Sequence, residues 1–213
     1  MTLIMKKLLV LLFSLFFLIS PSVFADDISD FQIEGISIGD SLLDYMSEDE
    51  ILKKIELKEN DFSYLKEPNK YVQINLYKAF PTYKSGLSFL VKNNSSNQYI
   101  TNQNEKYRIE SIHGVIDYNE DFDGCIAKRN EIVKVLSSMF LNAQKTEGDY
   151  AHSADPSGSS IVDGVWYTLD SVADVSAYCT NHEETFRFKM DWDEGLSIGI
   201  SSAEVSTWLS DLK

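Results

Sequence analysis

The stretch Asn119-Glu-Asp-Phe-Asp-Gly-Cys-Ile126 marks the place where the spacing of apolar residues changes along the chain. Before it, residues 107–118 have the strand-like pattern of apolar and polar residues in alternation, with one shift of phase. After it, apolar residues recur at helical spacing over about four turns, at Ile126, Val133, Leu136 and Phe140. The stretch therefore predicts a strand-to-helix turn, with Cys125 in the first turn of the helix.

The same stretch is similar to the first half of a calcium-binding EF-hand loop. Counted from Asn119, the oxygen-bearing residues Asp121 and Asp123 fall at alternate positions, and Gly124 follows them as the loop requires. The last position of the loop needs a bidentate glutamate and is Asn130 here, so the ligand pattern is incomplete. We favour Asp123 as the helix cap, with Asp121 near the positive end of the helix dipole. Weak calcium binding at Asn119–Asn130 stays as an alternative.

Further alternation along the chain predicts the fold class. Strand patterns occupy residues 71–77, 87–91, 175–180, 186–192 and 196–200, and a capping box from Ser201 to Glu204 precedes a closing helix. Strands joined by short turns indicate an antiparallel sheet with one wet face. We expect an α+β domain with an antiparallel sheet of about five to six strands and two amphipathic helices, 124–141 and 203–212, packed on one face.

Residues 1–25 have the pattern of a cleavable export signal. Lys6 and Lys7 precede an apolar core at residues 8–19, and Ala25 ends a segment suited to a signal peptidase. A membrane-spanning helix needs about 20 residues, so an N-terminal anchor is the less favoured alternative. We expect a signal peptide that is cut after Ala25 and a single domain over residues 26–213, in the periplasm or outside the cell.

The charge of the chain argues against several classes of partner. It holds 33 Asp and Glu against 19 Lys and Arg, a formal net charge of −14. This surplus repels nucleic acids and, after cleavage of the leader, anionic membrane surfaces. His113, His152 and His182 lack the spacing of a zinc site, so no metal or cofactor is predicted. An unknown protein or small-molecule partner is expected instead.

The two cysteines of the chain are Cys125 and Cys179. An even count in an oxidising compartment predicts one disulfide, and the alternatives are two buried free thiols or a reactive cysteine. Cys179 shares the phase of Val175 and Ala177, on the side of the sheet where the helix that carries Cys125 is expected to pack. The disulfide is therefore geometrically reasonable.

The segment His152-Ser-Ala-Asp-Pro-Ser-Gly-Ser-Ser160 contains the residue types of a Ser/His/Asp hydrolase. It lies within residues 148–164, which are rich in Ser, Gly and Asp and are predicted to form a loop. Catalytic triads are assembled from distant segments and are recognised by geometry, so this local match is a weak signal. The sequence favours a non-enzymatic binding or envelope-accessory module. A periplasmic hydrolase that uses the His152–Ser160 loop is the alternative.

The segment Asp30-Phe-Gln-Ile-Glu-Gly-Ile-Ser-Ile-Gly-Asp-Ser-Leu-Leu-Asp-Tyr45 resembles the opening of a family of small exported proteins from marine alphaproteobacteria. The later Ser153-Ala-Asp-Pro-Ser-Gly158 and the cysteine that enters the helix, Cys125, are also similar to that family. The resemblance spans most of the chain after the leader. It implies an exported single domain, and it implies no activity, cofactor or catalytic residue.

Overall fold

The computed structural model describes residues 28, 31–57, 62–77, 80–83, 86–93, 105–169, 171 and 173–212. The expected signal peptide at residues 1–25 lies outside these ranges. The described helices are the short 3-10 helix η3 (Leu42–Asp44) and four α-helices: α2 (Glu48–Leu57), α3 (Phe122–Met139), α4 (Glu184–Met190) and α5 (Ala203–Ser210).

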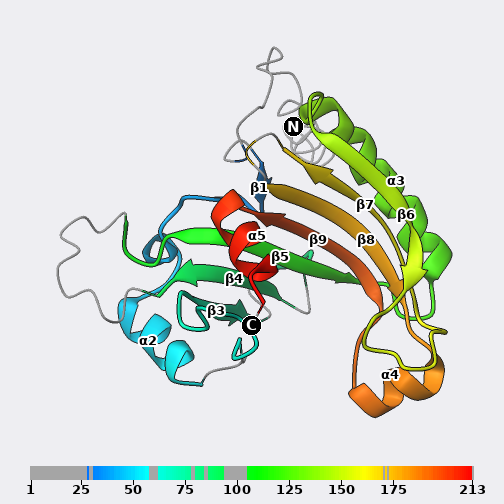
Figure 1. Cartoon of the computed structure of the whole chain (residues 1–213), viewed down its shortest axis with the longest axis horizontal. Helices are drawn as coiled ribbons and strands as arrows, with labels where there is room; N and C mark the ends of the chain where they lie inside the picture. The colour runs from blue at the N-terminus through cyan, green and yellow to red at the C-terminus, as the bar shows by residue number, and fades with distance from the viewer. Residues whose placement is uncertain are drawn as a thin grey trace, which may run out of the picture.

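One large antiparallel sheet organises the described chain (Figure 1). Its strands are β3 (Tyr71–Leu76), β4 (Leu87–Lys92), β5 (Ile109–Asp117), β6 (Gln144–Ala151), β7 (Ile161–Thr168), β8 (Asp174–Asn181) and β9 (Gly195–Ser201). Their order across the sheet is β3-β4-β5-β9-β8-β7-β6, so the last strand in the sequence lies between the two halves. A separate hairpin joins β1 (Gln32–Ile33) to β2 (Ile36–Ser37).

The α+β class is as predicted, but the sheet has seven strands rather than five to six. Two of the seven strands, β6 and β7, were not predicted, and the predicted loop at residues 148–164 overlaps both of them; the actual connection between β6 and β7 is residues 152–160. All eight residues of β6 are exposed. A fully exposed edge strand buries no apolar face, so it has no apolar alternation by which a sequence could reveal it.

One face of the sheet is apolar and packs against α3. Val175, Ala177 and Cys179 of β8 are fully buried on this face. Cys179 forms the predicted disulfide with Cys125 of α3, and their Cα atoms lie 6.0 Å apart. The Tyr167 hydroxyl of β7 lies 2.7 Å from the Ser137 hydroxyl of α3. The disulfide and this hydrogen bond together hold the helix across β7 and β8.

The N-terminal elements cover the rest of the apolar face. Ile36 of β2, Leu42 of η3 and Ile51 of α2 are fully buried in the same core as Phe89 of β4. The sequence Ser47-Glu-Asp-Glu50 forms the predicted capping box, in which the Ser47 amide donates to the Glu50 carboxylate at 3.0 Å and the Glu50 amide donates to the Ser47 hydroxyl at 3.4 Å.

The second predicted helix lies on the opposite face from α3, which corrects the expectation that both share one face (Figure 1). Trp208 of α5 packs its ring 4.8 Å from the ring of Tyr71, which belongs to the other phase of β3. The cap of α5 is Ser202 rather than Ser201. Ser201 still belongs to β9, where its hydroxyl lies 2.8 Å from that of Ser111.

The predicted strand at residues 186–192 is wrong, because most of it is the helix α4. The Glu183 carboxylate caps this helix by accepting from the Phe186 amide at 2.7 Å. Phe186 is buried, whereas Phe188 is exposed beneath the Arg187 guanidinium, 5.0 Å from its ring centroid. Apolar residues two apart thus point to different sides of a short helix, a pattern that imitates alternation in a strand.

Replacement of both cysteines, Cys125→Ala with Cys179→Ala, should lower the free energy of unfolding by about 4 kcal/mol, because the bridge closes a loop with a sequence separation of 54. Urea denaturation of the wild type and the double variant measures this difference. Wild type treated with a thiol reductant serves as the matched control and should show the same shift. An unchanged midpoint in both would contradict a stabilising role for the bridge.

Candidate functional site

The second face of the sheet is polar and uncharged through its middle. We call this region the polar face, and it consists of Gln73, Asn75, Ser88, Ser111, His113, Gly164, Trp166, Ser176, Tyr178, Thr180, Ser197 and Gly199. Among the described residues of the sheet, charged side chains on this side lie nearer the strand ends, as Lys92, Asp117 and Asp174 do. The polar face runs between α5 at one end and the α4–β9 turn at the other.

Two hollows lie on the polar face. The larger is about 280 Å³. Its lining from the sheet is Val115, Tyr178, Thr180, Gly195 and Ser197, and its lining beside α4 is His182, Asp191, Trp192 and Asp193. The smaller is about 140 Å³, and its polar lining comes from Gln73, Ser88, Ser111 and His113. Serine, threonine and glycine in the central strands keep the floor low, while the aromatic side chains stand around it.

A row of nearly parallel rings crosses the polar face. The rings of His113 and Tyr178 lie 6.3 Å apart at 29°, and those of Tyr178 and Trp166 lie 6.3 Å apart at 17°. His113 Nε2 and the Tyr178 hydroxyl are within hydrogen-bond distance at 3.3 Å. Gly164 makes this arrangement possible, since a Cβ there would come within 2.5 Å of both the Trp166 ring and Tyr178.

The histidine at the centre of this face is His113, and burial shifts its pKa. Burial lowers the pKa of His113 below the ordinary value of about 6.5. The imidazole is therefore neutral at physiological pH, with one nitrogen able to donate and the other able to accept. His113 thus contributes hydrogen-bonding capacity to the polar face without contributing charge.

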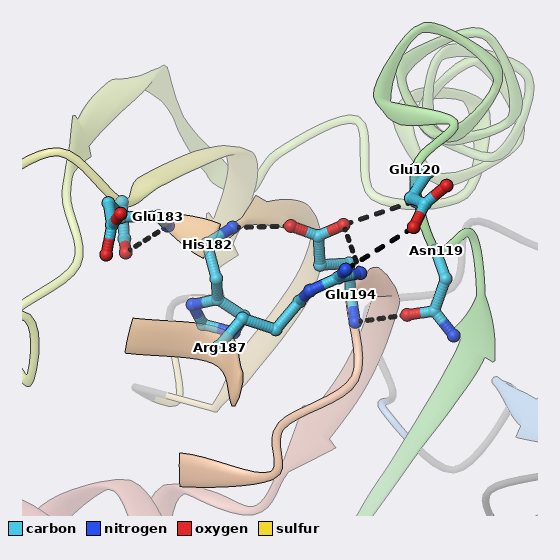
Figure 2. Close-up of polar contacts among 7 residues, drawn as sticks. Asn119, Glu120, His182, Glu183, Arg187 and Glu194 are labelled. Atoms are coloured by element: carbon cyan, nitrogen blue, oxygen red, sulfur yellow. Dashed lines mark hydrogen bonds and ion pairs between the residues drawn. The ribbon is translucent and has the colours of Figure 1, made fainter. Parts of the chain in front are cut away.

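A buried carboxylate anchors the end wall of the larger hollow (Figure 2). Glu194 accepts from the backbone amides of His182 at 2.8 Å and Glu120 at 3.2 Å, and its carboxylate lies 3.4 Å from the Arg187 guanidinium. The Asn119 side chain accepts from the Glu194 amide at 2.9 Å. These contacts fix α4, and with it Trp192, against the β5–α3 turn. The position of this wall is therefore fixed by contacts within the fold.

An aromatic cluster packs behind that wall. His152 and His182 have ring centroids 5.2 Å apart, and each also contacts Phe186 and Trp192. Burial, and then the neighbouring His152, lower the pKa of His182. The buried Nδ1 atom of His182 has no hydrogen-bond partner in the described structure. The cluster joins the His152–Ser160 loop to α4.

The predicted hydrolase residues do come together, but not as a triad. Asp155 accepts from the Ser157 hydroxyl and amide, both at 2.9 Å, and from the Ser160 amide at 2.8 Å. The hydrogen bonds from Ser160, and then those from Ser157, hold the pKa of Asp155 well below its usual range. Ser160 is fully buried and also accepts from the Glu183 amide. The His152 Nδ1 atom accepts from the Ala154 amide at 3.3 Å instead of activating a serine.

Two stretches of the sequence match the G-x-S-x-G pattern of a nucleophile elbow, Gly35-Ile-Ser-Ile-Gly39 and Gly195-Leu-Ser-Ile-Gly199. The first overlaps the β1–β2 hairpin, and the second lies wholly in β9, paired with both β5 and β8. Neither is the sharp strand-to-helix turn that presents such a serine. Ser197 contributes instead to the floor of the polar face.

The predicted calcium ligands do not share a centre. Asn119 accepts from the Glu194 amide, and Asp121 accepts from the Gly124 amide at 3.0 Å as the cap of α3. Asp121 is therefore the cap in place of the predicted Asp123, which lies within the first turn. Asn130 is inside the helix. The described residues contain no group of three or more His, Cys, Asp or Glu that could hold a metal ion.

Sequence reasoning missed the polar face as a site. Its residues come from six strands, and the pairing of β9 with β5 and β8 was needed to bring them together. The available signal was the wet phase of β5, β8 and β9, where Ser111, His113, Ser176, Tyr178 and Ser197 replace the charged residues of an ordinary solvated face.

Comparison with known proteins gave no match, whether to protein-family models, to curated proteins or to solved structures. None of the described helices is both long and apolar enough to span a lipid bilayer. The candidate site is therefore argued from the geometry and chemistry of this chain.

A fluorophosphonate probe should not label Ser157 or Ser160 in the folded protein, because the Ser157 hydroxyl donates to Asp155 and Ser160 is fully buried. Mass spectrometry after incubation with the probe checks this, and urea-unfolded protein provides the control for background reactivity. Labelling that Ser157→Ala or Ser160→Ala abolishes would establish the hydrolase alternative.

The free energy of unfolding should fall as the pH drops from about 6.5 towards 5, because the pKa values of His113 and His182 are lowered in the folded state. In that window the unfolded chain binds more protons, so acid favours unfolding; above it the stability is fully present. Urea denaturation across this range measures the slope. His113→Gln keeps a hydrogen-bonding group and should show a shallower loss, and an identical slope in both proteins would count against the assignment.

Proposed function

We propose that this protein is a non-enzymatic binding module, exported by the signal peptide at residues 1–25 and active in the periplasm or outside the cell. Its ligand binds on the polar face. The observation that carries this proposal is the hydrogen-bonding and hollowed middle of that face, whose sheet residues are uncharged, in a chain with a net charge of −14.

The chemistry of the polar face supports binding. Gln73, Asn75 and Ser88 already bond to one another, with the Ser88 hydroxyl donating to Asn75 at 2.6 Å and the Gln73 amide donating to Asn75 at 2.9 Å. Mutual bonds of this kind fix the side chains before a ligand arrives, which lowers the entropy cost of binding. The larger hollow is close to the lower end of the usual size range of ligand pockets, about 300 Å³.

The disulfide supports the proposed location in the periplasm or outside the cell. A bridge between Cys125 and Cys179 is compatible with an oxidising compartment, such as the periplasm or the extracellular space. The described residues also contain no free cysteine. A binding role in that compartment requires no catalytic residues, in keeping with the arrangement of the His152–Ser160 loop.

Filling the larger hollow should abolish binding. Ser197→Trp places a bulky ring on the floor, and Ser138→Trp on the exposed side of α3 is the matched control. The two variants and the wild type would be titrated with neutral, anionic and cationic small molecules and with short peptides, followed by amide chemical shifts. We expect saturable shifts of polar-face residues with at least one class, weakened more than about tenfold only in Ser197→Trp.

Circular dichroism would confirm that both variants are folded before they are compared. Three outcomes would overturn the proposal. These are no saturable binding of any class at millimolar concentration, shifts confined to residues outside the polar face, or equal binding by the wild type and Ser197→Trp.

A further inference from the structure

We propose that the ligand of the polar face is a neutral oligosaccharide whose sugar rings stack on the row of rings formed by His113, Tyr178 and Trp166. This inference rests on the proposed function and names the chemical class of the ligand. It is argued from the geometry of the rings, the types of hydrogen-bonding groups and the position of the charges.

The ring row is the proposed stacking platform. Successive centroids lie 6.3 Å apart, and the planes of neighbouring rings differ by 29° and 17°. The C–H groups on one side of a sugar ring carry partial positive charge, and they pack against the negative faces of aromatic rings. Because three strands supply the rings, the platform extends across the sheet and can contact more than one sugar unit.

The hydrogen-bonding groups beside the platform match sugar hydroxyls. A sugar hydroxyl both donates and accepts, as do the hydroxyls of Ser88, Ser176, Thr180 and Ser197 and the side-chain amides of Gln73 and Asn75. Ser197 and Thr180 line the larger hollow together with Tyr178. Ser88 and Gln73 line the smaller hollow together with His113. Each hollow therefore combines a ring with several hydroxyl or amide groups.

The two hollows adjoin, because His113 of the smaller one contacts Tyr178 of the larger one at 3.3 Å. Their volumes of about 140 and 280 Å³ are small and arranged in sequence across the strands. A linear chain of small units fits this arrangement better than one compact ligand.

The charges disfavour an anionic ligand. In the larger hollow the acidic residues Asp191 and Asp193 flank Trp192 at the α4–β9 turn, and the smaller hollow is lined by no charged residue. Two carboxylates at one end repel an anionic ligand, yet they can each accept charge-assisted hydrogen bonds from neighbouring sugar hydroxyls. The floor itself is formed by uncharged sheet residues, so it offers no ion pair to a ligand of either sign.

Calorimetry with defined sugars tests the inference. Chitotetraose, cellotetraose and maltotetraose are the neutral probes, and tetragalacturonic acid is the anionic control. We expect at least one neutral probe to bind saturably, with a change in tryptophan fluorescence, and the anionic probe to bind at least about tenfold more weakly. Trp166→Ala should weaken binding by about tenfold or more, through loss of one stacking surface.

Three further variants separate the loss of a ring from a folding defect. Tyr178→Phe keeps the ring and loses only the hydroxyl, so it should weaken binding by a smaller factor than Tyr178→Ala. Tyr64→Ala removes an exposed ring that lines neither hollow, and this variant should bind like the wild type. Circular dichroism accompanies each variant.

The outcomes separate this inference from the proposed function. If none of the three neutral sugars binds, or if the anionic probe binds as tightly, the sugar inference is wrong. The same holds if Trp166→Ala and Tyr178→Ala, folded, bind like the wild type. In each of these cases the proposed function survives when another class, such as a short peptide, is blocked by Ser197→Trp. The proposed function fails when Ser197→Trp weakens the binding of no class of ligand.

Discussion

The structure depends on the pairing of β9 with two partners that are far from each other in sequence. Residues 195–201 pair on one side with residues 111–117 of β5 and on the other side with residues 174–180 of β8. Without this strand the sheet would divide into a β3–β5 half and a β6–β8 half. β9 is also nearly buried throughout, with Leu196, Ile198 and Ile200 on the α3 face. One strand thus supplies both the central hydrogen bonds and the middle of the core.

The same strand shapes the candidate site, because side chains alternate across a sheet. Its other phase holds Gly195, Ser197 and Gly199, which are small and uncharged. A larger residue at position 199 would approach the Ser176 hydroxyl, to 3.0 Å from the new Cβ. The apolar phase therefore joins the two halves, while the small phase leaves room between the rings of His113 and Tyr178. The same strand therefore contributes both to the stability of the fold and to the hollowed surface.

The sequence predicted those parts of the fold that bury a regular apolar pattern. The stripe of α3, the alternation of Val175, Ala177 and Cys179 and the disulfide are all present as expected. It failed where burial is absent or irregular: β6 is wholly exposed, β7 buries Val162, Val165 and Tyr167 at uneven spacing, and α4 buries Phe186 while exposing Phe188. The polar face could not be assembled from the sequence, because Gln73 and Ser197 become neighbours of one surface only through tertiary pairing. The His152–Ser160 loop contains the residue types of a hydrolase, yet its hydrogen bonds stabilise the turn around Asp155.

The position of the disulfide within this topology has a consequence for the order of assembly. The bridge encloses residues 125–179 and so ties α3 to β8, but β9 lies beyond it. Oxidation of the thiols and closure of the sheet are therefore separable events. Until β9 is paired, β5 and β8 would each present an unpaired edge to the solvent. Insertion of β9 covers both of these edges at once, so it removes two sites of edge-to-edge association in one step.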